Sequence, residues 1–226
     1  MEIKNKDLKR RLIELSYKYK LSHLGSVLTA VDIIEEIYWA KKPKEKFILS
    51  CGHAGLALYC VIEKYLGVNA EKIWLHHGTH PDRCLDCHLD CSTGSLGQGL
   101  PISCGLALAD RKKNVYCLIS DGECSEGSIW EAMRIKDEQK LNNLIVYLNY
   151  NRFGAYKETP FPVMLIGDTC PISECEHRQK GNLYYPPNID RIVVNLVNDF
   201  PFLKGLDAHY KIMSEEEYLQ AMEILK

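Results

Sequence analysis

Two short apolar runs, each ending at oxygen-bearing side chains, constrain the fold of this chain more than any other feature. Residues 115–119 are apolar and lead to Asp121, Gly122 and Glu123, while residues 144–148 are apolar and lead to Asn151. Each run has the length of a strand, and the segment between them has the pattern of a helix. The sequence therefore predicts a strand–helix–strand unit with two parallel strands.

The polar residues of this unit fall at the carboxyl ends of both predicted strands. Open parallel sheets bind their ligands at that edge. A hard cation such as Mg²⁺ takes one or two protein oxygens together with phosphate oxygens. The carboxylate of Asp121 and the amide of Asn151 therefore predict a metal ion that bridges the protein to a diphosphate.

The rest of the chain alternates between helical and strand patterns, which predicts an α/β fold with a parallel sheet flanked by helices. Helices are expected at residues 5–19, 28–39, 53–65, 99–109 and 214–225, and further strands at residues 47–49 and 192–196. Ser214, with Glu217 three residues later, has the pattern of a helix N-cap. Residues 75–92 and 156–190 are expected to be irregular.

Length and composition exclude several classes of protein. The chain has 226 residues, 46% of them hydrophobic, and a net charge of −2, which favours one globular domain over residues 1–226. The basic residues are scattered, so no nucleic acid partner is expected. No apolar stretch approaches the roughly 20 residues of a membrane span, and the amino terminus lacks the apolar core of a signal peptide. We therefore expect no membrane partner and a cytoplasmic location.

Five ordered blocks carry a family resemblance that reaches from Ser22 to Lys211. They read SHLGSVLTAVDIIEEIYW from Ser22, SCGHAGLALY from Ser50, STGSLGQGLPISCGLALA from Ser92, DGECSEGSIWEA from Asp121, and DAHYK from Asp207. In this order they resemble the thiamine diphosphate-binding half of the transketolases. The resemblance implies a single thiamine diphosphate-binding domain, shortened around residues 156–190. The chain departs from the family at Ser120, where glycine is usual.

The resemblance implies a metal site and part of a cofactor site. Asp121, Asn151 and the backbone carbonyl of Phe153 are the implied ligands of Mg²⁺ (or Ca²⁺), and the ion in turn holds the cofactor diphosphate. Gly122 has no Cβ and would let its backbone approach a phosphate oxygen. The implied contacts to the aminopyrimidine ring come from Gly94 and Leu96.

Four histidines and two glutamates match further family positions. His53 is the implied contact to the diphosphate, and His209 lies near both the diphosphate and the reacting carbon. His23 and His80 would line the channel of the donor sugar, where an imidazole can exchange a hydrogen bond or a proton with a substrate hydroxyl. The remaining catalytic and cofactor-binding candidates are Glu126 and Glu131, which match residues near the cofactor and the subunit interface. His76, His77 and His88 match no family position and are interpreted as loop residues.

Three of the ten cysteines, Cys84, Cys87 and Cys91, lie close together in sequence. A Cys-x2-Cys pair often begins a zinc site, and the remaining ligands could come from Cys170, Cys175 or His177. Free thiols in a reducing compartment are the simpler interpretation, and an iron–sulfur cluster is the third.

The function implied is that of one subunit of a thiamine diphosphate-dependent transketolase. Such an enzyme transfers a two-carbon ketol unit from a ketose (phosphate) to an aldose. A separate pyrimidine-binding subunit would be required for activity, in an α2β2 heterotetramer. Two alternatives stay open: a specialised carboligase of sugar biosynthesis that uses the same cofactor, and a non-catalytic, zinc-organised subunit with the same fold.

Overall fold

A computed structural model describes residues 3–152, 154, 159, 189–194 and 199–226. The described residues form four strands in one parallel sheet, in the order β1-β2-β3-β4. The strands are β1 Lys46–Leu49, β2 Val115–Ser120, β3 Leu144–Tyr150 and β4 Arg191–Val194. The predicted parallel α/β fold is confirmed.

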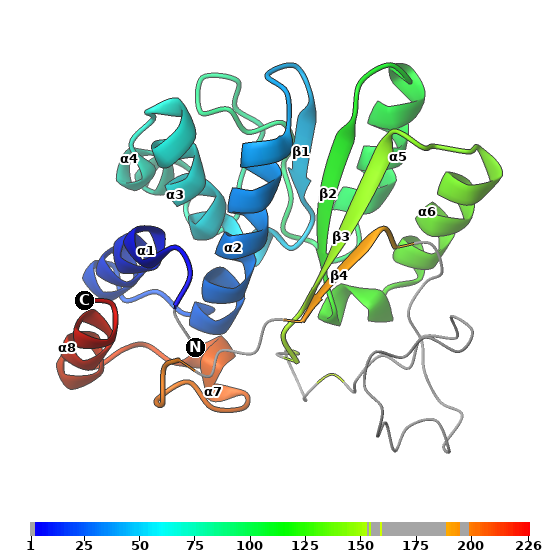
Figure 1. The fold of residues 1–226 in the computed structure, drawn as a ribbon. Coiled ribbons are helices and arrows are strands. Elements are labelled where there is room, and N and C mark those ends of the chain that lie inside the picture. The colour runs from blue at the N-terminus through cyan, green and yellow to red at the C-terminus, as the bar shows by residue number, and fades with distance from the viewer. Residues whose placement is uncertain (1–2, 153, 155–158, 160–188, 195–198) are drawn as a thin grey trace, which may run out of the picture.

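Helices cover both faces of the sheet (Figure 1). In chain order they are α1 Lys6–Lys18, α2 Leu24–Ala40, α3 Gly55–Leu66, α4 Ala70–His77, α5 Gly99–Ala109, α6 Gly127–Glu138, α7 Asp207–Tyr210 and α8 Glu215–Ile224, with short 3-10 turns η1 Gly52–Ala54 and η2 Gly122–Ser125. α5 and α6 pack on the face of the sheet opposite to α1, α2 and α3.

The central strand β2 shows why this arrangement is stable. Every residue of β2 is buried, and successive side chains of a strand point to opposite faces. Tyr116 and Leu118 join the core beneath α1 to α3, whereas Cys117 and Ile119 join the core beneath α5 and α6. A strand buried on both faces is continuously apolar, as expected for a parallel sheet.

The predicted helix at residues 214–225 is confirmed as α8, and its capping signal is real. The Ser214 hydroxyl accepts from the backbone N–H of Glu217 at 3.2 Å, and the Glu217 carboxylate accepts from the backbone N–H of Ser214 at 2.9 Å. α8 then packs on α1, where the rings of Tyr17 and Tyr218 stack with their centroids 4.3 Å apart. The cap therefore supports the contact between the two ends of the chain.

Two predicted boundaries were wrong. The second helix begins at Leu24 rather than near residue 28. Residues 75–77, expected to be irregular, lie in α4, because the Asn69 side chain caps this helix by accepting from the backbone N–H of Lys72 at 3.0 Å. His76 and His77 are therefore helical residues and not loop residues. The shortened segment at residues 156–190 lies almost entirely outside the described residues.

Within the described part of the chain, none of the helices combines the length and the apolar character that a bilayer crossing requires.

Candidate functional site

Asp121 lies at the carboxyl end of β2, in the turn that begins η2. Its carboxylate is 1% exposed and accepts from the backbone N–H of Gly122 at 2.9 Å and of Arg152 at 2.8 Å. Because Arg152 directly follows Asn151, the carboxylate lies against the turn that ends β3. Burial raises the pKa of Asp121, while backbone donors oppose that shift. Among the described residues, no cationic side chain forms an ion pair with this carboxylate.

Asn149 and Asn151, at the carboxyl end of β3, connect this edge of the sheet to α2. The side-chain nitrogens of both residues donate to the Thr29 hydroxyl at 2.9 Å, and that hydroxyl donates to the carbonyl of Gly25 at 2.8 Å. The Nδ2 atom of Asn151 is thereby engaged, so Oδ1 is the amide atom suited to coordinate a cation. The Oδ1 atom of Asn149 is buried without a hydrogen-bond partner among the described residues.

Glu123 is a buried carboxylate beside Asp121 to which the sequence interpretation assigned no role. Its carboxylate is fully buried and accepts from the Ser50 hydroxyl at 2.6 Å, the Gly97 N–H at 2.9 Å and the Ser120 N–H at 3.0 Å. Burial raises its pKa, but its partners all donate, which is the environment of an ionised carboxylate. Glu123 therefore joins the ends of β1 and β2 to residues 94–99, the glycine-rich loop that leads into α5.

A local signal for Glu123 was present in the sequence. Ser120 and Glu123 are spaced as in a capping box, and the Ser120 hydroxyl accepts from the Glu123 N–H at 3.4 Å. The serine that departs from the family pattern thus belongs to this network.

Three of the predicted histidines converge from distant parts of the chain. His23 precedes α2, His53 lies in η1 and His209 lies in α7. The ring centroid of His23 is 4.3 Å from that of His209 and 5.4 Å from that of His53, and those of His53 and His209 are 6.0 Å apart. The backbone N–H of His23 also donates to the carbonyl of His209 at 2.8 Å, which fixes α7 against the start of α2.

This cluster is electrically neutral near pH 7. Burial, with a smaller effect of neighbouring imidazoles, lowers the pKa of His23 to about 4 and that of His53 to about 3. Burial also lowers the pKa of His209. The Nδ1 atoms of His23 and His209 are buried without a hydrogen-bond partner among the described residues, and such orphaned atoms are rare in folded proteins.

The glycine-rich loop begins beside this cluster, where Gly94 lies against His80 and Gly52. A Cβ added to Gly94 would lie 3.1 Å from the Cδ2 atom of His80, and one added to Gly52 would lie 2.7 Å from the backbone nitrogen of Gly94. His80 itself is exposed, and Leu96 is half-buried. Backbone atoms of residues 93 and 94 therefore leave room only for glycine at position 52, whereas the neighbour of Gly94 is the His80 side chain.

The remaining predicted site residues fall into two groups. Glu126 is the exposed residue that precedes α6, and Glu131 is exposed on α6. Neither side chain reaches the histidine cluster through a hydrogen bond within the described residues. Phe153 lies outside the described residues.

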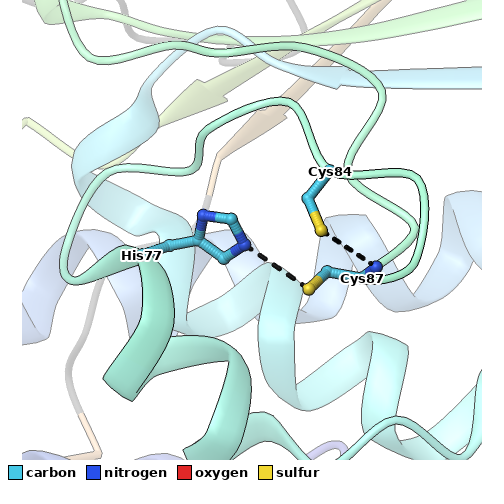
Figure 2. Close-up of side chains that lie close together, drawn as sticks. All are labelled: His77, Cys84 and Cys87. Atoms are coloured by element: carbon cyan, nitrogen blue, oxygen red, sulfur yellow. Dashed lines mark hydrogen bonds between the residues drawn. The ribbon is translucent and has the colours of Figure 1, made fainter.

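The cysteine cluster has a different membership from the one predicted. The ligand atoms of His77, Cys84 and Cys87 all lie within 4.8 Å of one another (Figure 2). Cys91 is not part of this group, and its sulfur lies 3.2 Å from the carbonyl oxygen of Ser92. The other predicted ligands, Cys170, Cys175 and His177, lie outside the described residues.

The fold and its polar edge define a class: an open parallel α/β domain whose candidate ligand site lies at the carboxyl ends of the strands. Residues 17–159 match the family described as "Transketolase, thiamine diphosphate binding domain". The chain therefore belongs to the transketolase family, in its thiamine diphosphate-binding domain.

Two relatives illustrate the similarity. The chain is 31% identical over 172 residues to a protein of Phocaeicola vulgatus that is named as one subunit of an apulose-4-phosphate transketolase, covering 67% of this chain and 61% of that protein. It is 40% identical over 127 residues to human transketolase, covering 51% of this chain and 20% of the human protein. The chain thus matches less than two thirds of each of these two relatives.

Solved structures of transketolases share the fold. The crystal structure of transketolase from Campylobacter jejuni matches with a TM-score of 0.63 at 19% identity, over 100% of this chain and 43% of that one. Transketolase from Leishmania mexicana matches with a TM-score of 0.67 at 16% identity, over 97% of this chain and 40% of that one.

Proposed function

We propose that this chain is the diphosphate-binding subunit of a thiamine diphosphate-dependent transketolase. It would act with a second chain that binds the pyrimidine end of the cofactor, and transfer a two-carbon ketol unit from a ketose (phosphate) to an aldose. Membership of the family supports the reaction class. The P. vulgatus relative is named as one subunit of its enzyme, which supports a division between two chains.

The observation that carries this proposal is the buried carboxylate of Asp121. Asp121 is 1% exposed, and burying a carboxylate costs free energy unless hydrogen bonds or a positive charge compensate it. Asp121 accepts from two backbone N–H groups, and the described residues supply no cationic partner. A divalent cation would compensate the carboxylate, and Mg²⁺ readily combines one or two protein oxygens with phosphate oxygens. We therefore assign Mg²⁺ (or Ca²⁺) to Asp121, Asn151 and the backbone carbonyl of Phe153.

The histidine cluster fits the sugar and diphosphate end of such a site. Neutral imidazoles can donate at one ring nitrogen and accept at the other, and the buried Nδ1 atoms of His23 and His209 still need partners. When bound, thiamine diphosphate supplies the carbanion chemistry that cleaves the ketose beside its carbonyl. In this proposal His53 and His209 orient the diphosphate end, while His23 and His80 hold the hydroxyls of the donor sugar or exchange protons with them.

The glycine-rich loop and the start of α6 would form the side that faces the partner chain. Gly94 and Leu96 would contact the aminopyrimidine ring. Glu126 and Glu131 are exposed and would contact the pyrimidine-binding chain. An α2β2 assembly follows by analogy with the two halves of the family fold, and a neighbouring reading frame that resembles the missing half would identify the partner.

Calorimetry on the assembled complex tests cofactor binding. The full chain, co-expressed with the pyrimidine-binding partner, would be titrated with thiamine diphosphate in the presence of Mg²⁺. Asp121→Asn should weaken binding at least about 100-fold, because even groups that only support metal ligands contribute 10- to 100-fold. Asp137→Asn, an exposed change on α6, should bind like wild type. The absence of binding to the wild-type complex would refute the proposal.

Activity assays then separate the alternatives. The complex would be given a panel of ketose phosphates and free ketoses with aldose acceptors, and the products identified by mass spectrometry. Ketol transfer supports a transketolase, whereas a different carbon–carbon bond formed from the same cofactor supports a specialised carboligase. Tight cofactor binding without turnover on any donor would indicate a non-catalytic subunit.

A further inference from the structure

A second cluster of potential metal ligands lies between α4 and the glycine-rich loop. His77 is the last residue of α4, and Cys84 and Cys87 lie in the turn that follows (Figure 2). Both cysteines are half-buried free thiols. The candidate cofactor site uses none of these three side chains. We propose that His77, Cys84 and Cys87 bind a zinc ion.

The distances between the ligand atoms agree with a tetrahedral zinc site. Zinc lies about 2.3 Å from a cysteine sulfur and about 2.0–2.1 Å from a histidine nitrogen. In a tetrahedron these bond lengths separate a sulfur from a nitrogen by about 3.6 Å and two sulfurs by about 3.8 Å. The Nε2 atom of His77 lies 3.4 Å from the sulfur of Cys87, and all three ligand atoms lie within 4.8 Å of one another. The separation of His77 and Cys87 is about 0.2 Å shorter than the tetrahedral value, and the other two separations exceed theirs by at most about 1.2 Å.

The backbone holds the two sulfurs in place. Cys84 and Leu89 form an antiparallel bridge with N–H to carbonyl distances of 3.0 and 2.8 Å. His88 occupies the left-handed region, with φ of 56°, and closes the turn between them. The backbone N–H of Cys87 donates to the sulfur of Cys84 at 3.3 Å. A hydrogen bond of this kind helps to orient a ligand atom toward a metal.

Hydrogen bonds also fix the end of α4. The backbone N–H of Gly78 donates to the carbonyl of Trp74 at 2.7 Å, and the Tyr59 hydroxyl donates to the carbonyl of Gly78 at 3.2 Å. These bonds attach the residue after His77 to α3. The imidazole and the two thiols are therefore presented by separate segments that the fold has already brought together.

The donor set selects the kind of metal. Two thiolates and an imidazole suit zinc and disfavour Mg²⁺ and Ca²⁺, which prefer oxygen ligands. Since the cluster is half-buried, a water molecule can occupy the fourth position. Cys91 is excluded because it is not part of the group, which makes it a matched control from the same segment.

The site would stabilise the segment that carries part of the candidate cofactor site. Residues 78–93 connect α4 to the glycine-rich loop, and the backbone N–H of Thr93 donates to the carbonyl of Pro81 at 3.0 Å, next to His80. A metal at His77, Cys84 and Cys87 would restrain this segment at its start and middle. This consequence rests on the proposed function, whereas the metal site itself does not.

Metal analysis of the full chain tests the proposal without cofactor or substrate. Wild type purified with zinc chloride should retain about one zinc per chain after dialysis. Cys84→Ser, Cys87→Ser and His77→Gln should each lower zinc affinity at least about 100-fold, more than the 10- to 100-fold effect of supporting groups. Cys91→Ser should bind zinc like wild type. Loss of zinc from Cys91→Ser, or equal zinc content in all variants, would overturn the assignment.

Cobalt titration of wild type keeps the test decisive if a cysteine variant fails to fold. Cobalt bound to a tetrahedral site of two thiolates should give sulfur-to-metal charge-transfer and d–d absorption bands that saturate at one equivalent and disappear when zinc is added. Absence of the charge-transfer band, or thiol titration that finds Cys84 and Cys87 oxidised to a disulfide in the purified chain, would refute the proposal. Because neither measurement involves thiamine diphosphate, this failure is distinguishable from failure of the proposed transketolase function.

Discussion

Replacing Glu123 with glutamine should destabilise the domain far more than a conservative change usually does. The Glu123 carboxylate accepts from Ser50 and Gly97 at one oxygen and from the backbone of Ser120 at the other. A glutamine amide has one acceptor oxygen and one NH₂ donor. Whichever way it is oriented, its NH₂ group must face a backbone N–H of either Gly97 or Ser120.

The expected loss of stability in Glu123→Gln follows from this mismatch between donors. One buried backbone N–H loses its acceptor, which costs about 1–3 kcal/mol. The remaining hydrogen bonds lose the assistance of the negative charge, worth about a further 1 kcal/mol. Glu123→Gln should therefore lower the free energy of unfolding by about 2–4 kcal/mol. Glu123→Ala should lower it by more, because it leaves both backbone donors unpaired and creates a cavity.

Urea unfolding of the full chain, followed by circular dichroism and fluorescence, measures this effect through the midpoint and the slope. Glu126→Gln is the matched control, since this glutamate lies three residues further along, is exposed and caps no backbone group with its side chain. The control should change stability by less than about 0.5 kcal/mol. If Glu123→Gln costs no more than the control, the reasoning about the buried network is wrong.

Three further predictions concern the loop, the histidines and the carboxyl-terminal helix. Gly97→Ala should lower the free energy of unfolding in urea melts by about 1–3 kcal/mol more than Gly67→Ala does. Both glycines have positive φ (81° and 74°), but only at Gly97 would the new Cβ clash, with the Ser128 hydroxyl. Equal losses of stability would contradict this. His53 has a pKa of about 3, below its ordinary value of 6.5, so the unfolded chain takes up this proton first as the pH falls. The stability it contributes is full above pH 6.5 and should decline by up to about 1.4 kcal/mol per pH unit as the pH falls toward 4; His53→Asn should flatten the profile, and an unchanged slope would count against a buried neutral imidazole. Ser214→Ala should lower stability by about 1 kcal/mol, measured by the same melts, and no loss would show that the capping box of α8 contributes nothing.

Local sequence patterns were sufficient to predict most of the fold. The run at residues 115–119 became β2, and the run at 144–148 became β3, because continuous apolar segments of strand length bounded by polar turns have few other stable arrangements. The cap at Ser214 was equally visible, since a capping box is contained within four residues. α4 was missed because its eight residues, Ala70–His77, mix charged and aromatic side chains and show no apolar periodicity.

The candidate site was less predictable from local patterns. Asp121 and Asn151 could be paired in advance, because parallel strands with one crossover bring their carboxyl ends to the same edge. The histidines at positions 23, 53 and 209 were proposed only through the family resemblance, since nothing local relates residues so far apart. The network of Glu123 was missed although the spacing of Ser120 and Glu123 was informative, because its other partners, Ser50 and Gly97, come from distant segments.

The sequence by itself determined the order of the strands along the chain, their burial and the turn that places Asp121 beside the residues after β3. These features depend on interactions within one or two neighbouring elements, which a linear pattern records. Only the tertiary structure decided that Glu123 joins three segments, that His77 rather than Cys91 meets Cys84 and Cys87, and that the imidazoles are neutral. Those outcomes depend on long-range packing and on the loss of water around charged groups, which no local window of sequence contains.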